Sequence, residues 1–311
     1  MRVIVSDTVF GAASFQDLHK LLGLCSDGRH LVEIDPLDGP GWQAFLGRRS
    51  LQDREYFQGI IDTCLQELAR SGQPTALRIP DVPLIDALRI LSAPLHVVVE
   101  NKRNDGAFLK AVALGPQRRE IRTALEKGWL DFENGGGLDE ISERVKAKHF
   151  DSRRTFVVAD SDAREPGAPS RQAARLAQLC VDHALGHHIL YRRERENYLP
   201  LTALQFWLEK SSRQRQRTKR SLLGHFRALS PAQRHHFNMR EGLKGDGDAV
   251  SSLYAEVGLP AQRALQDGFA KDVGKLFETG SDDGCLTEDW LLEDGQRDES
   301  QKLFGALLAR L

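Results

Sequence analysis

The sequence has few cysteines and no long apolar run. Its four cysteines form no CxxC pair, and they are Cys25, Cys64, Cys180 and Cys285. This spacing argues against a zinc site and against a disulfide framework. The start of the chain lacks the basic and apolar regions of a signal peptide, and no run of about eighteen apolar residues occurs, so we expect no leader and no membrane contact. The sequence therefore predicts a protein of the reducing cytoplasm.

The chain also lacks an excess of charge of either sign. It has 43 basic and 44 acidic residues, which give a net charge of -1. A surface for a polyanion can therefore arise only where charges of one sign are grouped. The phosphate-binding pattern G-x-x-x-x-G-K-[ST] does not occur. We expect no ATP hydrolysis by this chain and no nucleotide cofactor.

Strand and helix patterns alternate through the middle of the sequence. Apolar runs such as LHVVVE at 95–100 are typical of strands that are buried on both faces. Their alternation with helical patterns indicates parallel strands with helices packed outside, in which the working groups lie just beyond the carboxyl ends of the strands. The predicted strands are 95–100, 129–133, 154–162 and 187–194, and the predicted helices are 106–114, 138–150 and 169–185.

The patterns divide the chain into three parts. Residues 1–90 form a small N-terminal α/β unit, residues 91–200 the parallel α/β module, and residues 201–311 a helical C-terminal region. The predicted fold class is therefore α/β, with a parallel Rossmannoid sheet flanked by helices. Within the first part the predicted elements are strands at 2–5, 30–35 and 75–80, a helix beginning near Ser14 and a helix over 53–71.

Acidic residues follow two of the buried strands. Glu100 ends the first strand of the module, and Asp160 and Asp162 end the third, so all three lie at one edge of the sheet. Residues two apart in extended backbone face the same side. A single acid after a strand is more often a helix cap or a turn residue, but three converging carboxylates repel one another unless a cation lies between them. Mg²⁺ or Mn²⁺ suits such oxygen ligands.

Three segments resemble a known family. VVVENKRNDGAFL at 97–109, TFVVADSDA at 155–163 and YRRERENYLP at 191–200 are similar, in that order and spacing, to the Toprim domain of the OLD-family nucleases. Those enzymes cleave DNA with two metal ions. The resemblance implies two Mg²⁺ or Mn²⁺ ions and a set of catalytic metal ligands in this chain, namely Glu100, Asp160, Asp162 and Glu196.

The first segment departs from the family pattern. Asn101 stands where glycine is usual, and Asn104 stands where the family has its second acid, which here comes one residue later as Asp105. Asp105 is therefore either a fifth metal ligand or the N-cap of the helix predicted at 106. In the segment at 191–200 there is a second candidate ligand, because Glu194 lies two residues before Glu196. We favour Glu196, which the apolar residues after it should hold in place.

A cluster of positive charge follows the module. Nine basic residues and no acid occur between Lys210 and Arg240. This grouping predicts contact with the phosphate backbone of DNA, and the alternative is a solvated helix face. The DNA-binding residues that we predict are Lys210, Arg213, Arg215, Arg217, Lys219 and Arg220. An acidic run at 278–299 is expected to be a solvated loop or, alternatively, a segment that covers the basic surface.

Together these features predict a metal-dependent DNA endonuclease or nickase that uses a two-metal mechanism. OLD-family proteins usually carry an ATPase before the Toprim domain, and this chain has none. The resemblance therefore implies a nuclease subunit of a bacterial defence system that acts with a separate ATPase or sensor protein. The alternative function is a non-catalytic DNA-binding or scaffolding subunit with a degenerate Toprim fold, which the displaced acid at Asp105 favours.

Overall fold

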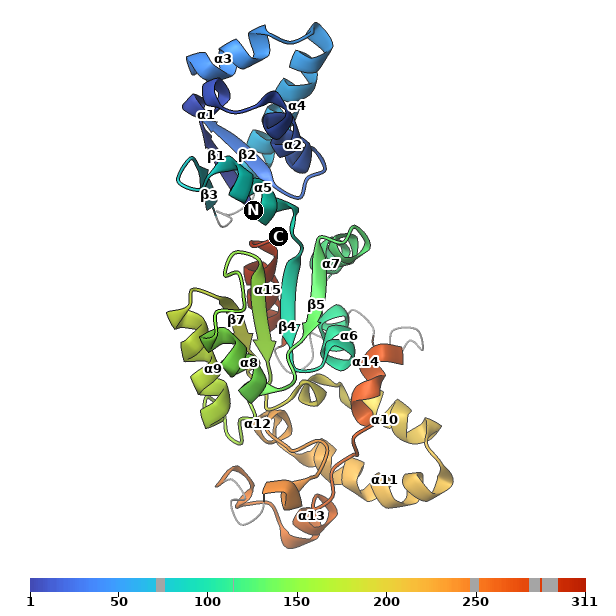
Figure 1. Ribbon diagram of the computed structural model, residues 1–311. Helices are drawn as coiled ribbons and strands as arrows, with labels where there is room; N and C mark the ends of the chain where they lie inside the picture. Colours follow the sequence, from blue (N-terminus) through green and yellow to red (C-terminus); the bar gives the residue numbers. More distant parts are fainter. Residues whose placement is uncertain (71–75, 114, 247–251, 280–285, 287–295) are drawn as a thin grey trace. The chain divides into compact units, whose positions relative to one another are not determined.

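The computed structural model describes residues 1–70, 76–113, 115–246, 252–279, 286 and 296–311 (Figure 1). The chain forms two compact units. The first comprises Met1–Leu95, Ala124–Asp131 and Gly305–Leu311, and the second comprises His96–Thr123 and Phe132–Phe304. The helices between residues 200 and 279 thus belong to the same unit as most of the central sheet, and the three-domain division stays a prediction.

The first unit is built on a small parallel sheet. Its strands lie in the order β2-β1-β3, and β1 runs parallel to both neighbours. They are β1 Arg2–Ser6, β2 Leu31–Asp35 and β3 Ala76–Ile79. The helices are α1 Asp7–Ala12, α2 Phe15–Ser26, α3 Pro40–Gly47, α4 Leu51–Arg70 and α5 Leu84–Ser92. The predicted strands and the two predicted helices are confirmed, apart from residues 71–75, which lie outside the described residues.

Helix α2 shows why this part of the chain folds as it does. The side chain of Ser14 accepts a hydrogen bond from the backbone N–H of Asp17 at 3.2 Å and so caps the first turn. Leucines and a cysteine recur at helical spacing on one face and pack into the core with Val3 and Val5. The described cysteines are buried and free, and they are Cys25, Cys64 and Cys180.

The second sheet has four strands in the order β5-β4-β6-β7. β6 runs parallel to both β4 and β7. Every residue of β6 is buried, as its continuous apolar sequence predicts. The strands are β4 Leu95–Val99, β5 Leu130–Asn134, β6 Thr155–Ala159 and β7 Gly186–Ile189. The prediction of an α/β fold with parallel strands flanked by helices is confirmed.

Helices cover this sheet. One face packs on α8 Leu138–Lys146 and α9 Arg171–Asp182, whose apolar residues form one core with the buried residues of β4 and β6. α6 Lys102–Val112 begins four residues earlier than predicted, because Asn101 accepts the N–H of Asn104 at 3.0 Å and is the N-cap. α7 Gly115–Glu126 was not predicted, since only two of its described residues, Ile121 and Ala124, are buried.

In its described part, the chain after residue 200 consists of helices and short turns, as predicted. The longer helices are α10 Leu201–Lys210, α11 Arg213–Ala228 and α15 Gln296–Leu308. The shorter ones are α12 Pro231–His235, α13 Leu259–Ala264 and α14 Leu276–Thr279. Four 3-10 turns complete the described elements: η1 Arg195–Tyr198, η2 Leu243–Asp246, η3 Ser252–Tyr254 and η4 Val273–Lys275.

Candidate metal centre

The predicted acids come together beyond the carboxyl ends of β4 and β6. Glu100 follows β4 directly, and Asp160 follows β6. The backbone N–H of Asp160 hydrogen-bonds Glu100. The carboxylate of Asp160 in turn accepts the backbone N–H of Arg195 at 3.1 Å. Three segments that are far apart in the sequence therefore meet at this edge of the sheet, as the strand order requires.

The D-S-D segment at 160–162 is not extended. Asp162 has a φ of 49°, in the left-handed region that aspartate tolerates better than most residues. Ser161 is buried, and its hydroxyl donates to the carbonyl of Arg192 at 2.7 Å. The N–H of Asp162 donates to the carbonyl of Arg193 at 2.8 Å. The strand predicted to continue to residue 162 ends at Ala159, so the extended backbone expected here is wrong.

The segment after β7 also departs from the prediction. β7 ends at Ile189, and the 3-10 turn η1 places Glu194 at its start, where the N–H of Glu194 donates to the side chain of Asn197 at 3.0 Å. Glu194 and Glu196 therefore do not share one side of an extended strand. All residues from 192 to 200 are buried. Both glutamates reach the acidic site, so their positions alone do not show which of them would be the metal ligand.

Two arginines form ion pairs with the acids of the site, and neither was predicted from the sequence to do so. Arg195 pairs through Nη1 with Asp105 and through Nη2 with Glu196, the latter at 3.1 Å. Arg240 pairs with Glu194 at 3.3 Å and with Glu196 at 3.2 Å. The sequence analysis counted Arg240 at the end of the basic cluster. Because it lies 44 residues from Glu196 in the sequence, no local pattern reveals the contact.

Asp105 has a role that neither sequence interpretation gave. It is not the N-cap of α6, which is Asn101. Its carboxylate instead accepts the backbone N–H of Asn101 at 2.7 Å and binds Arg195. Asp105 therefore closes the first turn of α6 onto the loop after β4 and fixes the position of Arg195.

Burial makes the carboxyl groups of the site harder to ionise. Burial, together with the nearby charges of Asp105 and Asp162, raises the pKa of Glu100 to about 7. The pKa of Asp160 lies well above its usual range because of burial and of Glu100. Burial followed by the charge of Glu196 raises the pKa of Glu194 to about 7. The two arginines thus do not balance all of the buried negative charge.

The donor set fits a hard divalent cation. It consists of carboxylates, and the buried Oε2 of Glu196 has no hydrogen-bond partner, which leaves an acceptor for a cation or a water. In the arrangement that the described residues adopt, no three Asp, Glu, His or Cys side chains converge as a preformed metal site. The carboxylates of Asp105 and Glu196 point to arginines instead. Metal binding stays a prediction.

The basic cluster divides into paired and exposed residues. Arg215 pairs with Asp272 at 2.6 Å, Lys219 donates to the carbonyl of Gly268 at 2.5 Å, and the ammonium of Lys210 lies 4.6 Å from the ring centre of Phe206. The remaining predicted residues are exposed on α11, and they are Arg213, Arg217 and Arg220. These three are the better candidates for contact with a phosphate backbone.

The acidic run at 278–299 is described only at its ends and at residue 286. Glu278 pairs with Arg103 at 2.8 Å. Glu299 is buried, lies 2.9 Å from Nε2 of His188 within hydrogen-bond distance, and accepts a hydrogen bond from the hydroxyl of Tyr198 at 2.6 Å. The solvated-loop prediction is therefore wrong for Glu299. Whether the run covers the basic surface concerns residues 280–285 and 287–295, which lie outside the described residues.

Comparisons with known proteins add no relative. The chain matches no protein-family model, no curated protein and no solved structure. Among the helices within the described ranges, none has both the length and the apolar character needed to cross a membrane.

Proposed function

We propose that this protein is a Toprim-type, metal-dependent phosphodiesterase that cuts or nicks DNA. The observation that carries the proposal is the meeting of acids from three distant segments, after β4, after β6 and in η1, at the carboxyl edge of one parallel sheet. The resemblance of these segments to the Toprim domain of OLD-family nucleases supports the same function. It implies two ions held by Glu100, Asp160, Asp162 and Glu196, with Asp105 as a fifth ligand.

Each group has a distinct task in this proposal. A divalent ion at the carboxylates would act as a Lewis acid toward a phosphodiester. Arg195 and Arg240 hold Glu196 in place. The hydrogen bonds from Ser161 and Asp162 to the backbone of residues 192 and 193 hold the D-S-D segment against the late acids. The exposed arginines of α11 bind the DNA backbone through charge.

The partner belongs to the proposal as well. The sequence has no phosphate-binding loop of the Walker A kind. A nuclease controlled by ATP would therefore need a separate ATPase or sensor protein, and the resemblance favours a bacterial defence system as the setting. A pull-down from the native host with the tagged protein, followed by an ATPase assay on the captured proteins, tests this part.

Incubation of the purified protein with supercoiled plasmid tests the activity. We expect nicked or linear DNA with Mg²⁺ or Mn²⁺ and none with EDTA. Asp160→Asn should abolish the activity, and Glu120→Gln, which changes an exposed acid of α7, should retain it. Intact plasmid with every divalent ion, or cleavage by Asp160→Asn at the wild-type rate, would contradict the proposal.

A non-catalytic subunit is the second candidate, because the arginines already occupy two of the predicted ligands. A DNA-binding or scaffolding protein with a degenerate Toprim fold would need no ion. In the same experiment, this function predicts a shift of the plasmid in native gels without nicking, both in EDTA and in Mg²⁺.

A further inference from the structure

Arg195 lies in the middle of the acidic site. Its backbone N–H donates to Asp160 at 3.1 Å, and its guanidinium pairs with Asp105 and with Glu196. Its side chain is only 9% exposed. One buried residue therefore binds an acid from α6, an acid from the end of β6 and an acid from η1. This is the central position that a cation takes in a carboxylate cluster.

The acids fall into two groups by their contact with arginine. In the first group Asp105 pairs with Arg195, Glu194 pairs with Arg240, and Glu196 pairs with both arginines. The acids of the second group form no ion pair with any part of the chain that the structure describes, and they are Glu100, Asp160 and Asp162. The acids of the second group therefore feel the arginines only at longer range, and burial holds their pKa values above the usual range in spite of those charges.

The space beside Arg195 is small. The cavity that Arg195 lines with Asp105 and Asp160 is otherwise walled by apolar residues of α6, β6 and the end of β7, and it has a volume of about 10 Å³. A cavity of about 10 to 15 Å³ on the same measure holds one water molecule. A divalent ion with its remaining water ligands does not fit there while Arg195 stays in place.

A second ion would therefore have to displace the guanidinium. That change would break the pairs of Arg195 with Asp105 and Glu196 and leave a buried positive charge whose Nε already lacks a partner. An unpaired buried charge is strongly unfavourable, and a dication beside Arg195 and Arg240 is also repelled. An ion at Glu100, Asp160 and Asp162 breaks no ion pair.

We propose that the protein binds one divalent ion, at Glu100, Asp160 and Asp162, and that the guanidinium of Arg195 takes the place of a second ion between Asp105 and Glu196. This inference rests on the proposed metal-dependent function and changes its ion count. Glu196 is then a positioning residue, which holds Arg195 and Arg240 and does not bind the ion.

Titration with Mn²⁺ tests the ion count without any measurement of cleavage. Isothermal calorimetry and the electron paramagnetic resonance of free Mn²⁺ both give the number of bound ions per chain. The titration is done on the full-length protein alone and again with a phosphorothioate DNA duplex, because a second ion could arrive with the substrate. Three variants accompany the wild type: Asp160→Asn, Glu196→Gln and the exposed control Glu120→Gln.

We expect one bound Mn²⁺ in the wild type, with and without DNA, one in Glu196→Gln and in Glu120→Gln, and none in Asp160→Asn. Two ions in the wild type, or loss of the ion in a folded Glu196→Gln variant, would overturn the inference and leave the proposed nuclease standing. No bound ion and no nicking in the wild type would overturn both. The wild-type count decides the question even if a variant fails to fold.

Discussion

Arg193 donates from both terminal nitrogens of its guanidinium to the carboxylate of Asp246, at 2.9 and 2.6 Å, and both side chains are buried. The same guanidinium lies 3.3 Å from the carbonyl oxygen of His236. This pair joins the segment after β7 to η2, which is 53 residues further along the chain. The residue next to Glu194 is thereby fixed in the core.

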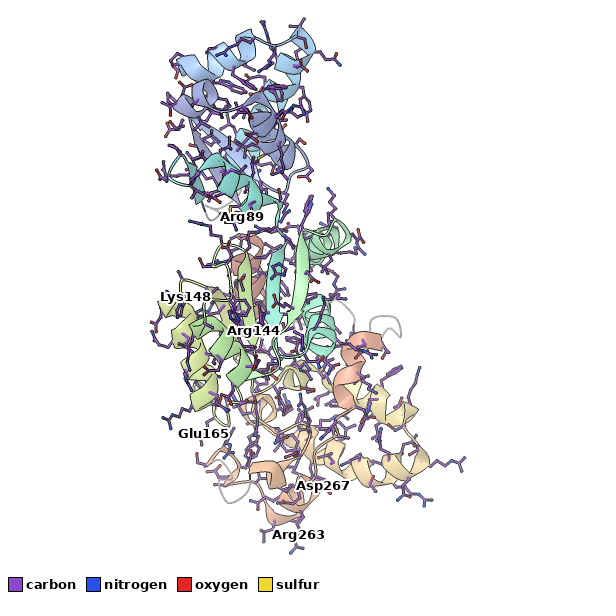
Figure 2. The ribbon with its side chains drawn as sticks, viewed as in Figure 1. Arg89, Arg144, Lys148, Glu165, Arg263 and Asp267 are labelled. Carbon is purple, nitrogen blue, oxygen red and sulfur yellow. The ribbon has the colours of Figure 1, made fainter. Side chains whose placement is uncertain are left out.

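The first prediction concerns this pair. Asp246→Asn should lower the free energy of unfolding by about 3 to 5 kcal/mol, because it leaves a buried guanidinium without its counter-charge. Urea unfolding followed by circular dichroism measures the loss. Lys244→Gln is the control, since Lys244 pairs with the exposed Asp267 labelled in Figure 2, and it should cause no measurable change. Equal effects of the two substitutions would contradict the buried pair as a major source of stability.

The second prediction concerns pH. The pKa of Glu100 and that of Glu194 rise from 4.5 in the unfolded chain to about 7 in the folded protein. Between these values the folded state binds more protons, so stability falls as pH rises from 4.5 to 7 and then stays low. Three further carboxyl groups have pKa values shifted in the same direction, and they are Asp105, Asp160 and Asp162.

Melting temperatures in EDTA at pH 5 and pH 8 check this prediction, and we expect the lower value at pH 8. Burial lowers the pKa of His236, and this shift favours greater stability as pH rises toward 6.5. The five carboxyl groups with raised pKa values act in the opposite direction and outnumber it. Glu194→Gln should flatten the profile. A metal-free protein that is more stable at pH 8 than at pH 5 would show that the acids are not buried as described.

The third prediction concerns Tyr198. Its hydroxyl donates to Glu299 at 2.6 Å and accepts the N–H of Arg192 at 3.2 Å, and burial raises its pKa. Tyr198→Phe should therefore cost about 1 to 3 kcal/mol of stability, since it leaves a buried carboxylate with one donor fewer. It should leave nicking intact, because a buried phenol with a raised pKa is a poor nucleophile. Tyr191→Phe, on an exposed ring, is the control. A folded Tyr198→Phe protein that no longer nicks DNA would point to a tyrosine-based mechanism.

The fourth prediction concerns α11. The triple substitution of Arg213, Arg217 and Arg220 by Gln should weaken DNA binding and reduce the slope of log K against log salt by up to about 0.9 per lost phosphate contact. Fluorescence anisotropy with a labelled duplex at several salt concentrations measures the slope. An equal loss of charge at exposed positions elsewhere, by the substitution of Arg119, Arg122 and Arg171, should leave the slope unchanged. Equal slopes for the two triple variants would show that α11 is an ordinary solvated face.

Much of the fold could be predicted because its strands are unusually apolar. β4 and β6 have apolar sequences with no alternation, which is typical of strands covered on both faces, and the structure buries them. The acids that follow these strands could be predicted for the same reason, since parallel strands bring their carboxyl ends to one edge. α7 could not be predicted, because it has few apolar residues and only two of its described residues are buried.

The arginines of the site could not be predicted from the sequence. The segment at 192–196 carries five charged residues in a row, a composition typical of exposed chain. Its burial depends on partners far along the chain, such as Arg240 and Asp246. Only the apolar Tyr198 and Leu199 that follow hint that the segment enters the core.

The position of Arg195 among the acids has a consequence for the order of assembly. Many small metal-binding domains stay unfolded until the ion binds, because a preformed site is rare in the unfolded chain. Here part of the repulsion among the acids is offset by the guanidinium of Arg195, which is part of the chain itself. Under the proposed metal-dependent function the protein would therefore fold first and take up the ion afterwards, so a chelator should abolish activity without unfolding the protein, and addition of the ion should restore activity without a refolding step.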